Sequence, residues 1–268
     1  MIPLLRAFWK YFWSAKTAHG LHSPFVFHLY AQVIIPPASP RASLPTAWHK
    51  LRADFLQNKT PLAFEEIGAG SKQLRRSSGR TIAQITHTAA TTPAKAQLLY
   101  RLVSFCQPLQ VLELGTCVGL GTLAMAYALP PQASLFTFEG APPLASLSEV
   151  VFEQQAPAEI SISLVAGHLD QTLPAWASEH TRIDFAFLDA NHRFEPTLRY
   201  FDTLLPLCHE DTCLVFDDIH WSAEMEAAWE TICQHESVTL SLDLFNIGVV
   251  FFRRKQPKQH FVLWHTSF

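Results

Sequence analysis

The residues with the clearest chemical meaning are three glycines that follow a short apolar run in VLELGTCVGLGT, at Gly115, Gly119 and Gly121. Glycine lets a backbone turn tightly and approach a ligand closely, so the run predicts a ligand-binding turn between a strand and a helix. Its G-x-x-x-G-x-G spacing reverses that of dinucleotide sites, and the final GK[ST] of a P-loop is missing. Glu113, two residues earlier, would repel a pyrophosphate but suits an ammonium or sulfonium charge. These features favour S-adenosylmethionine over a nicotinamide dinucleotide as the ligand.

A second acid is spaced to reach the other half of such a cofactor. Glu139 comes twenty residues after Gly119, at the end of the next apolar run, where a carboxylate can accept hydrogen bonds from both hydroxyls of a ribose. Thr116 and Gly140 belong to the same two turns, and we expect them to line the cofactor. A helix-capping role explains either acid alone. Their combination with the glycine spacing favours cofactor binding.

Three further carboxylates follow two later apolar runs: Asp189 ends one run, and Asp217 and Asp218 end the next. If these runs form neighbouring strands, three like charges meet at one edge of the sheet and need a cation. Oxygen ligands of this kind suit a hard divalent ion such as Mg²⁺, Mn²⁺ or Ca²⁺ rather than zinc. The alternative is that the acids cap helices or hold loops, with Asp189 contacting only the cofactor amine. The residues alone leave both interpretations open.

The elements that position these residues are predicted by an alternation of apolar runs and helical patterns after residue 109. SVTLSLDLF and NIGVVFFRRK are too close together for a helix between them, so they predict an antiparallel hairpin. We therefore expect an α/β fold: a Rossmann-like doubly wound sheet of five parallel strands closed by a C-terminal antiparallel hairpin, in the order 3-2-1-4-5-7-6. The five parallel runs are LQVLELG (109–115), SLFTFEG (134–140), ISISLVAG (160–167), IDFAFLDA (183–190) and DTCLVFDD (211–218).

The first third of the chain has a different character, because prolines at 36, 37, 40 and 45 break any regular pattern. We expect an N-terminal helical and loop extension over 1–85 that acts as a lid or acceptor-site cap, a cofactor-binding domain over 86–256, and a tail over 257–268. Basic residues interrupt MIPLLRAFWKYFWSAK well short of a membrane span, and packing against the body is favoured over an interfacial anchor. The charged run with Lys72, Arg75, Arg76 and Arg80 reads as a solvated loop, with a grip on an anionic substrate as the alternative.

Composition excludes several classes of protein. A hydrophobic content of 49% and a charged content of 16% exclude a disordered chain. The net charge of -3 provides no global basic field, so nucleic acid is not an expected partner, and no stable membrane insertion is expected either. Five scattered cysteines without a CxxC pair indicate neither a disulfide framework nor a structural zinc site. They fit a reducing, cytoplasmic compartment.

Two longer segments resemble a known family. TTPAKAQLLYRLVSFCQPLQVLELGTCVGLGTLAMAYALP is similar to the opening of the class I methyltransferases that use S-adenosylmethionine, in particular the catechol and caffeoyl-CoA O-methyltransferase branch. The resemblance covers roughly residues 91–253. It implies that Glu113, Gly115 and Gly119 line the methionine part of the cofactor and that Glu139 holds the ribose. It further implies that Gly167 and His168 contact the adenine, although His168 stands where an acid or small polar residue is expected.

The second segment, DFAFLDANHRFEPTLRYFDTLLPL followed by FDDIHW, is similar to the metal-dependent O-methyltransferase pattern. In that pattern an Asp and a later Asp-Asn pair bind the ion, which here implies Asp189, Asp217 and Asp218 as metal ligands, with Asp218 in place of Asn. His192 falls where the family carries a Lys that assists deprotonation of the substrate, and an imidazole there can act as a general base. His220 is a rival for that role, and a plain loop hydrogen bond is the alternative for His192.

The sequence therefore predicts a methyltransferase that uses S-adenosylmethionine to methylate an oxygen of a small hydroxylated acceptor. A divalent ion such as Mg²⁺ is expected to assist the reaction. The oligomeric state stays open, with a homodimer as one option. The alternative is a non-catalytic cofactor-binding module that acts through a partner or a membrane surface. An NAD-dependent oxidoreductase is disfavoured by the glycine spacing.

Overall fold

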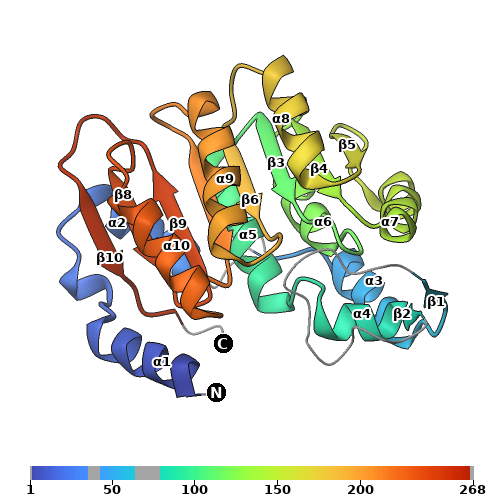
Figure 1. The fold of residues 1–268 in the computed structure, drawn as a ribbon, viewed down its shortest axis with the longest axis horizontal. Coiled ribbons are helices and arrows are strands. Elements are labelled where there is room, and N and C mark those ends of the chain that lie inside the picture. Colours follow the sequence, from blue (N-terminus) through green and yellow to red (C-terminus); the bar gives the residue numbers. More distant parts are fainter. Residues whose placement is uncertain (1, 36–42, 64–78, 266–268) are drawn as a thin grey trace.

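The computed structural model describes residues 2–35, 43–63 and 79–265. Its centre is an eight-stranded sheet with the order β10-β8-β9-β7-β6-β3-β4-β5 (Figure 1). The five strands β3 to β7 are parallel to one another, whereas β9 is antiparallel to both β7 and β8. The strands are β3 (Gln110–Leu114), β4 (Ser134–Glu139), β5 (Ser161–Ala166), β6 (Phe185–Leu188), β7 (Cys213–Asp217), β8 (Leu240–Asp243), β9 (Ile247–Phe251) and β10 (Gln259–Val262).

The expected α/β architecture is confirmed, and the seven expected strands lie in the predicted order. Residues 257–268 were predicted to form a tail outside the sheet. Within them, however, Gln259–Val262 form β10, which pairs in parallel with β8. A run of four residues is too short for its alternation to stand out in the sequence. Burial of Phe261 and Leu263 ties this strand to the core.

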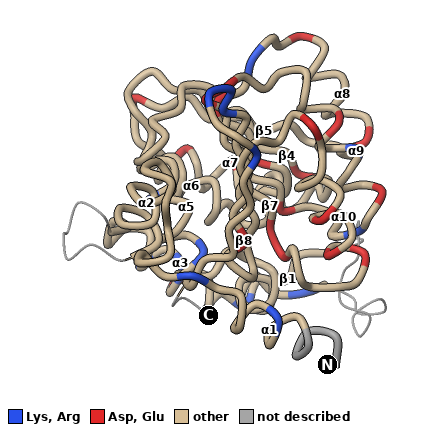
Figure 2. The backbone as a smooth tube through the Cα atoms, turned by 90° about the vertical axis from the view of Figure 1, so that its left-hand side faces the viewer, with Lys and Arg blue, Asp and Glu red and all other residues tan. Residues whose placement is uncertain are grey.

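Helices cover both faces of the sheet, as the side view shows (Figure 2). One face carries α2 (Pro24–Leu29), α5 (Pro93–Cys106) and α6 (Leu120–Ala126), and the other carries α8 (Leu169–Glu179), α9 (Phe194–Leu204) and α10 (Ala223–Gln234). Alternate residues of β3 explain the layers, because Val111 packs in the core with α5 while Leu112 and Leu114 pack in the core with α8 and α9. Strands buried on both faces read as continuous apolar runs, which made them visible in the sequence.

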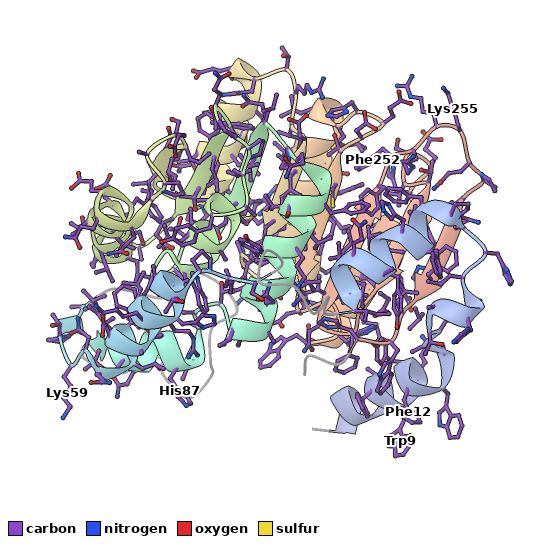
Figure 3. All side chains as sticks on the ribbon, turned by 180° about the vertical axis from the view of Figure 1, so that it is seen from behind. Trp9, Phe12, Lys59, His87, Phe252 and Lys255 are labelled. Carbon is purple, nitrogen blue, oxygen red and sulfur yellow. The ribbon has the colours of Figure 1, made fainter. Side chains whose placement is uncertain are left out.

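The N-terminal extension divides into two groups of helices at opposite ends of the sheet (Figures 1 and 3). The first, α1 (Ile2–Ser14) and α2, lies beside β8 and β10 and continues into the π-helical turn Tyr30–Ile34. The second, α3 (Thr46–Gln57), α4 (Ile82–Thr88) and the two-stranded β1 (Pro61–Leu62) and β2 (Arg80–Thr81), lies near α6 and α7 (Pro142–Gln155). The predicted boundary at residue 85 falls inside α4. Lys72, Arg75 and Arg76 lie outside the described residues.

Hydrogen bonds join the first group to the last strand. The Tyr11 hydroxyl donates to the Leu263 carbonyl (2.6 Å), and Lys16 and Leu263 form an isolated parallel bridge. The Lys16 amide donates to Val262, and the Trp264 amide donates to Lys16. The two ends of the described chain therefore form one packed unit. No described helix is both long and apolar enough to cross a membrane.

Candidate cofactor and acceptor site

The candidate site lies at the carboxyl edge of the parallel strands, because each strand there ends in a residue that the sequence singled out. Gly115 follows β3, Glu139 ends β4, Gly167 follows β5, Asp189 follows β6 and Asp217 ends β7. Neighbouring parallel strands all present their carboxyl ends at the same edge. The topology therefore brings residues from five segments of the chain into one region.

Gly115 is required by a close approach between two strand ends. Its φ is 102°, and a Cβ atom added there would lie 2.2 Å from the Asp189 carbonyl oxygen. The amides of Gly115 and Thr116 both donate to the Phe138 carbonyl, at 3.0 and 3.1 Å, which fixes the turn after β3. Gly115 thus holds the glycine loop against the segment that carries Asp189.

Gly119 and Glu139 shape the rest of the loop. Gly119 precedes α6 with a φ of 80°, and an added Cβ would lie 2.8 Å from the ring of Phe152. The Cys117 amide donates to Glu139 Oε2 and the Ala141 amide donates to Oε1, both at 2.8 Å. Burial raises the pKa of Glu139, while these amides oppose the shift. Each carboxylate oxygen has a second lone pair, so the position remains compatible with ribose hydroxyls as donors.

Glu113 lies beneath the loop instead of at its surface. Its carboxyl group is buried and accepts hydrogen bonds from the hydroxyls of Thr122 and Thr137 (2.6 Å for Thr137). Burial raises its pKa to about 8. A Cβ on Gly121 would lie 2.6 Å from the Glu113 carboxyl oxygen, so that glycine makes room for the acid. In this structure Glu113 supports the loop from inside, and its contact with a cofactor stays a prediction.

Gly167 and His168 follow β5 on the far side of Glu139. The Gly167 amide donates to the Glu139 carbonyl (2.9 Å), and its φ of 135° turns the chain into α8. His168 is exposed and caps α8, because its Nδ1 accepts a hydrogen bond from the Asp170 amide (3.3 Å). Both residues border the strand end that Glu139 occupies. Their contact with an adenine stays a prediction, as does that of Gly140.

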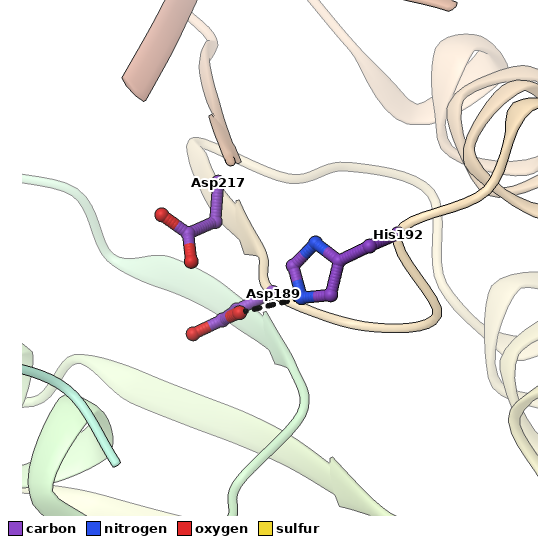
Figure 4. Close-up of side chains that lie close together, drawn as sticks. All are labelled: Asp189, His192 and Asp217. Atoms are coloured by element: carbon purple, nitrogen blue, oxygen red, sulfur yellow. Dashed lines mark ion pairs between the residues drawn. The ribbon is translucent and has the colours of Figure 1, made fainter. Parts of the chain in front are cut away.

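Asp189, His192 and Asp217 form a compact cluster (Figure 4). One donor atom from each lies within 4.8 Å of the others, and His192 Nε2 is 3.2 Å from Asp189 Oδ1. Asp218, whose backbone has a φ of 53°, is not in this group. The structure thus brings His192 together with two of the three predicted metal ligands.

Lys95 is the functional candidate that the sequence analysis missed. Its ammonium group pairs with Asp217 Oδ2, although the two residues are 122 positions apart. Lys95 lies in the first turn of α5, after the Thr92 cap and Pro93. A cation at that end opposes the helix dipole, which is the signal that could have drawn attention to it.

The charges of the cluster are strongly coupled. Burial and the neighbouring Asp189 raise the pKa of Asp217, and Lys95 opposes them. Burial also acts to raise the pKa of Asp189, but Lys95 and His192 outweigh it and hold the pKa well below its usual range. Burial acts to lower the pKa of His192, yet Asp189 raises it to about 9. The Asp189–His192 pair is therefore ionic near neutral pH.

Asp217 also carries an unsatisfied atom. Its Oδ1 is buried and finds no hydrogen-bond donor among the described residues, while Oδ2 is held by Lys95. A buried carboxylate oxygen without a donor is costly unless a cation or a proton meets it. The three donor groups of the cluster therefore fit a divalent cation. The donor set contains an imidazole in place of the third carboxylate expected from the sequence, and among the ions named there it suits Mn²⁺ better than Mg²⁺ or Ca²⁺.

A cavity of about 320 Å³ adjoins the cluster. Its lining includes Lys95, which pairs with Asp217, and Asp218, but none of the three cluster residues; Trp221, which is 63% exposed, also lines it. Leu244 and His265 close another side. A space of this size with an aromatic ring and a charged end suits a small organic acceptor.

His220 does not share the cluster, despite its position beside the two acids. Its Nε2 is 2.8 Å from Asp243 Oδ2, and its ring stacks on Phe245 with centroids 5.5 Å apart. These contacts hold it against β8 and in a different cavity, which Asp243 also lines. His220 therefore lies apart from Asp189 and Asp217, and the role of His192 as base stays a prediction.

A family model described as O-methyltransferase matches residues 68–246. The chain is 36% identical over 104 residues to the transmembrane O-methyltransferase homolog of Mus musculus, which covers 38% of this chain and 40% of that protein. It is 30% identical over 131 residues to the catechol O-methyltransferase of Niastella koreensis, which covers 48% of this chain and 58% of that protein. The matched segment spans about half the length of these relatives.

Solved structures share the fold. The O-methyltransferase from Bacillus cereus in complex with SAH has a TM-score of 0.56 at 17% identity, over 85% of this chain and 97% of that one. The SAH-bound methyltransferase PaMTH1 of Podospora anserina has a TM-score of 0.59 at 12% identity, over 87% of this chain and 97% of that one. At these identities the likeness establishes the architecture.

Proposed function

Since this chain belongs to the O-methyltransferase family, we propose that it transfers the methyl group of S-adenosylmethionine to a hydroxyl oxygen of a small acceptor. The observation that carries the proposal is the contact between the glycine loop and the acidic cluster. Gly115 lies against the carbonyl of Asp189, so a cofactor on the loop and an acceptor beside Asp189 would be neighbours. Methyl transfer needs this proximity above all, because the oxygen must attack in line with the sulfonium bond.

The cofactor would lie along the carboxyl edge from β6 to β5. Gly115, Thr116 and Gly119 would line its methionine part, and Glu139 would accept hydrogen bonds from the ribose. The adenine would then lie near Gly140, Gly167 and His168. Asp189 would face the amino group of the methionine end. Its low pKa supports this role, since the carboxylate stays charged.

The acceptor would occupy the cavity beside Asp218. The exposed ring of Trp221 supports an aromatic acceptor, as does the name of the Niastella relative, a catechol O-methyltransferase. In the reaction the oxygen–carbon bond forms as the sulfur–carbon bond breaks, and S-adenosylhomocysteine leaves. The hydroxyl proton would pass to the neutral form of His192. Because Asp189 raises the pKa of His192 to about 9, that neutral form is a minor species near neutral pH and increases as the pH rises towards 9.

A divalent ion fits the same cluster, with Asp189, His192 and Asp217 as the residues that would hold it. A ligating His192 would keep its proton on the other ring nitrogen, so with the ion bound it would be a ligand and not the base. When bound, such an ion would supply Lewis acidity that lowers the pKa of an acceptor hydroxyl. Lys95 orients Asp217 through its other oxygen, so the direction of the carboxylate is set by the chain itself.

The test is a calorimetric titration with S-adenosylmethionine, with Mg²⁺ and again with a chelator, followed by methyl-transfer assays on catechols and simple phenols. We expect cofactor binding in both titrations and turnover that falls in Asp217→Asn. Asp211→Asn, an exposed carboxylate in a turn, is the matched control. The proposal is overturned if the protein binds no cofactor in the titration with Mg²⁺ and none in the titration with the chelator. Binding without methylation of any acceptor would favour a non-catalytic cofactor-binding module.

A further inference from the structure

Helix α1 has two apolar faces, only one of which is covered. Ala7 and Tyr11 are buried against the body of the protein. On the opposite side Trp9 is 56% exposed, Phe12 is 43% exposed and Trp13 is 79% exposed. Figure 3 shows Trp9 on the outer side of α1, whereas Phe12 also packs edge-on against Trp264, with ring centroids 5.6 Å apart. The packing that the sequence predicted for this segment therefore accounts for one face only.

The charge of this part of the chain differs from that of the rest. Residues 1–53 contain six Lys or Arg and no Asp or Glu, whereas the remaining residues contain 14 Lys or Arg and 23 Asp or Glu. Lys10 and Lys16 are exposed on and just after α1. Figure 2 shows basic segments along the lower edge near α1 and α3, while acidic segments gather over α9 and α10. Lys50 and Arg52 lie on α3, at the other end of the sheet, so the described positive charge next to the exposed aromatic face is that of Lys10 and Lys16.

We propose that α1 binds the surface of an anionic lipid bilayer, with Trp9, Phe12 and Trp13 at the headgroup boundary. Tryptophan favours that boundary because its ring is apolar and its indole N–H is polar. Lysines beside such a face are attracted to anionic headgroups. A helix of 13 residues that is fastened to the body by Tyr11 lies along the surface and does not cross it.

The ion pair of Lys10 does not remove this attraction. Lys10 Nζ is 3.8 Å from Glu230, and both side chains are more than half exposed, so the pair is weak and screened. The attraction also does not depend on the catalytic proposal. No residue of the glycine loop or the acidic cluster lies on α1.

Vesicle flotation of the full chain tests the proposal. We expect it to float with phosphatidylcholine vesicles that contain phosphatidylglycerol, and much less with phosphatidylcholine alone. The Trp9→Gln, Trp13→Gln double variant should bind at least about tenfold more weakly. The Lys10→Gln, Lys16→Gln variant should lose about fivefold per lysine, and rising salt should have the same effect on the parent.

The matched control is Leu109→Gln, Val150→Gln, which removes two apolar side chains that are 52% and 50% exposed on other elements. It should float like the parent. The proposal is overturned if the parent stays with the unbound fraction, or if the tryptophan variant floats equally well. It is also overturned if light scattering shows a dimer that the tryptophan variant converts to a monomer without lipid, because α1 would then bind a second copy.

Discussion

Replacing Gly115 by Ala tests whether the glycine loop and the acidic cluster are held together by backbone contact. The substitution adds one carbon atom, which would lie 2.2 Å from the Asp189 carbonyl oxygen, and it does so where φ is 102°. Relief of the overlap requires a displacement of about 1 Å, to the 3.0–3.4 Å range of the tightest real contacts. The loop and the Asp189 segment must therefore move apart.

The expected loss follows from two terms. A non-glycine residue in this backbone region costs about 1–3 kcal/mol, and forcing an extra carbon into a packed contact costs about 1–3 kcal/mol more. The sum of about 4 kcal/mol corresponds to a fall of about 10 °C in the melting temperature of a chain of this size. Because Asp189 moves with its carbonyl, affinity for S-adenosylmethionine should fall as well.

Thermal unfolding and calorimetric titration of Gly115→Ala provide the measurement. Gly20→Ala is the matched control, since its added Cβ would be no closer than 3.4 Å to any atom, a side-chain carbon of Lys16. We expect this control to melt and bind like the parent. A Gly115→Ala protein that melts within about 2 °C of the parent and binds the cofactor equally well would refute the reasoning.

Three other changes have defined outcomes. Lys95→Met leaves the buried Asp217 carboxylate without its partner and should lower the free energy of unfolding by about 3–5 kcal/mol. Mg²⁺ should restore part of this stability if the cluster binds it. An unchanged melting temperature would contradict the pairing of Lys95 with Asp217. In the folded protein the pKa of Glu113 is raised from 4.5 to about 8, so its contribution to stability is full below about pH 4.5 and is lost as the pH rises towards 8. Between these pH values the melting temperature of Glu113→Gln should therefore fall less than that of the parent. Parallel plots of melting temperature against pH for the two proteins would contradict the shift. Trp221→Ala should raise the acceptor KM about two- to tenfold with stability and cofactor affinity unchanged, and an unaltered KM would remove Trp221 from the acceptor site.

The sequence predicted most of the sheet because its central strands are buried on both faces and leave strong apolar runs. It also located the carboxyl-edge residues, since Gly115, Glu139, Asp189 and Asp217 each stand at or just after a strand end. Residues at those places need only the correct strand order to meet. The local sequence pattern was therefore enough to predict that these four residues lie at the same edge of the sheet.

The details that the sequence did not predict depend on side-chain direction or on distant contacts. The pairing of Lys95 with Asp217 joins residues 122 positions apart, and no local pattern encodes it. Asp218 was predicted as a metal ligand and His192 as the base, but it is His192 that joins Asp189 and Asp217 in the cluster; both residues have positive φ angles, 53° for Asp218 and 38° for His192. Glu113 is adjacent to the loop in sequence, but the alternation of β3 points it under α6, where Thr122 and Thr137 meet it.

The joining of α1 to β10 has a consequence for how the chain acquires its structure. Tyr11 and Leu263, whose hydrogen bond fastens the helix, are 252 positions apart. During synthesis the inner face of α1 leaves the ribosome long before its partners exist, and contacts of such long range form slowly. The nascent protein would thus carry an uncovered apolar segment until almost the whole described chain has emerged. Deleting the chain from β10 onward would leave Phe245 as a remaining contact of this face but remove Val262 and Leu263, and we expect such a truncated chain to aggregate more readily than the parent.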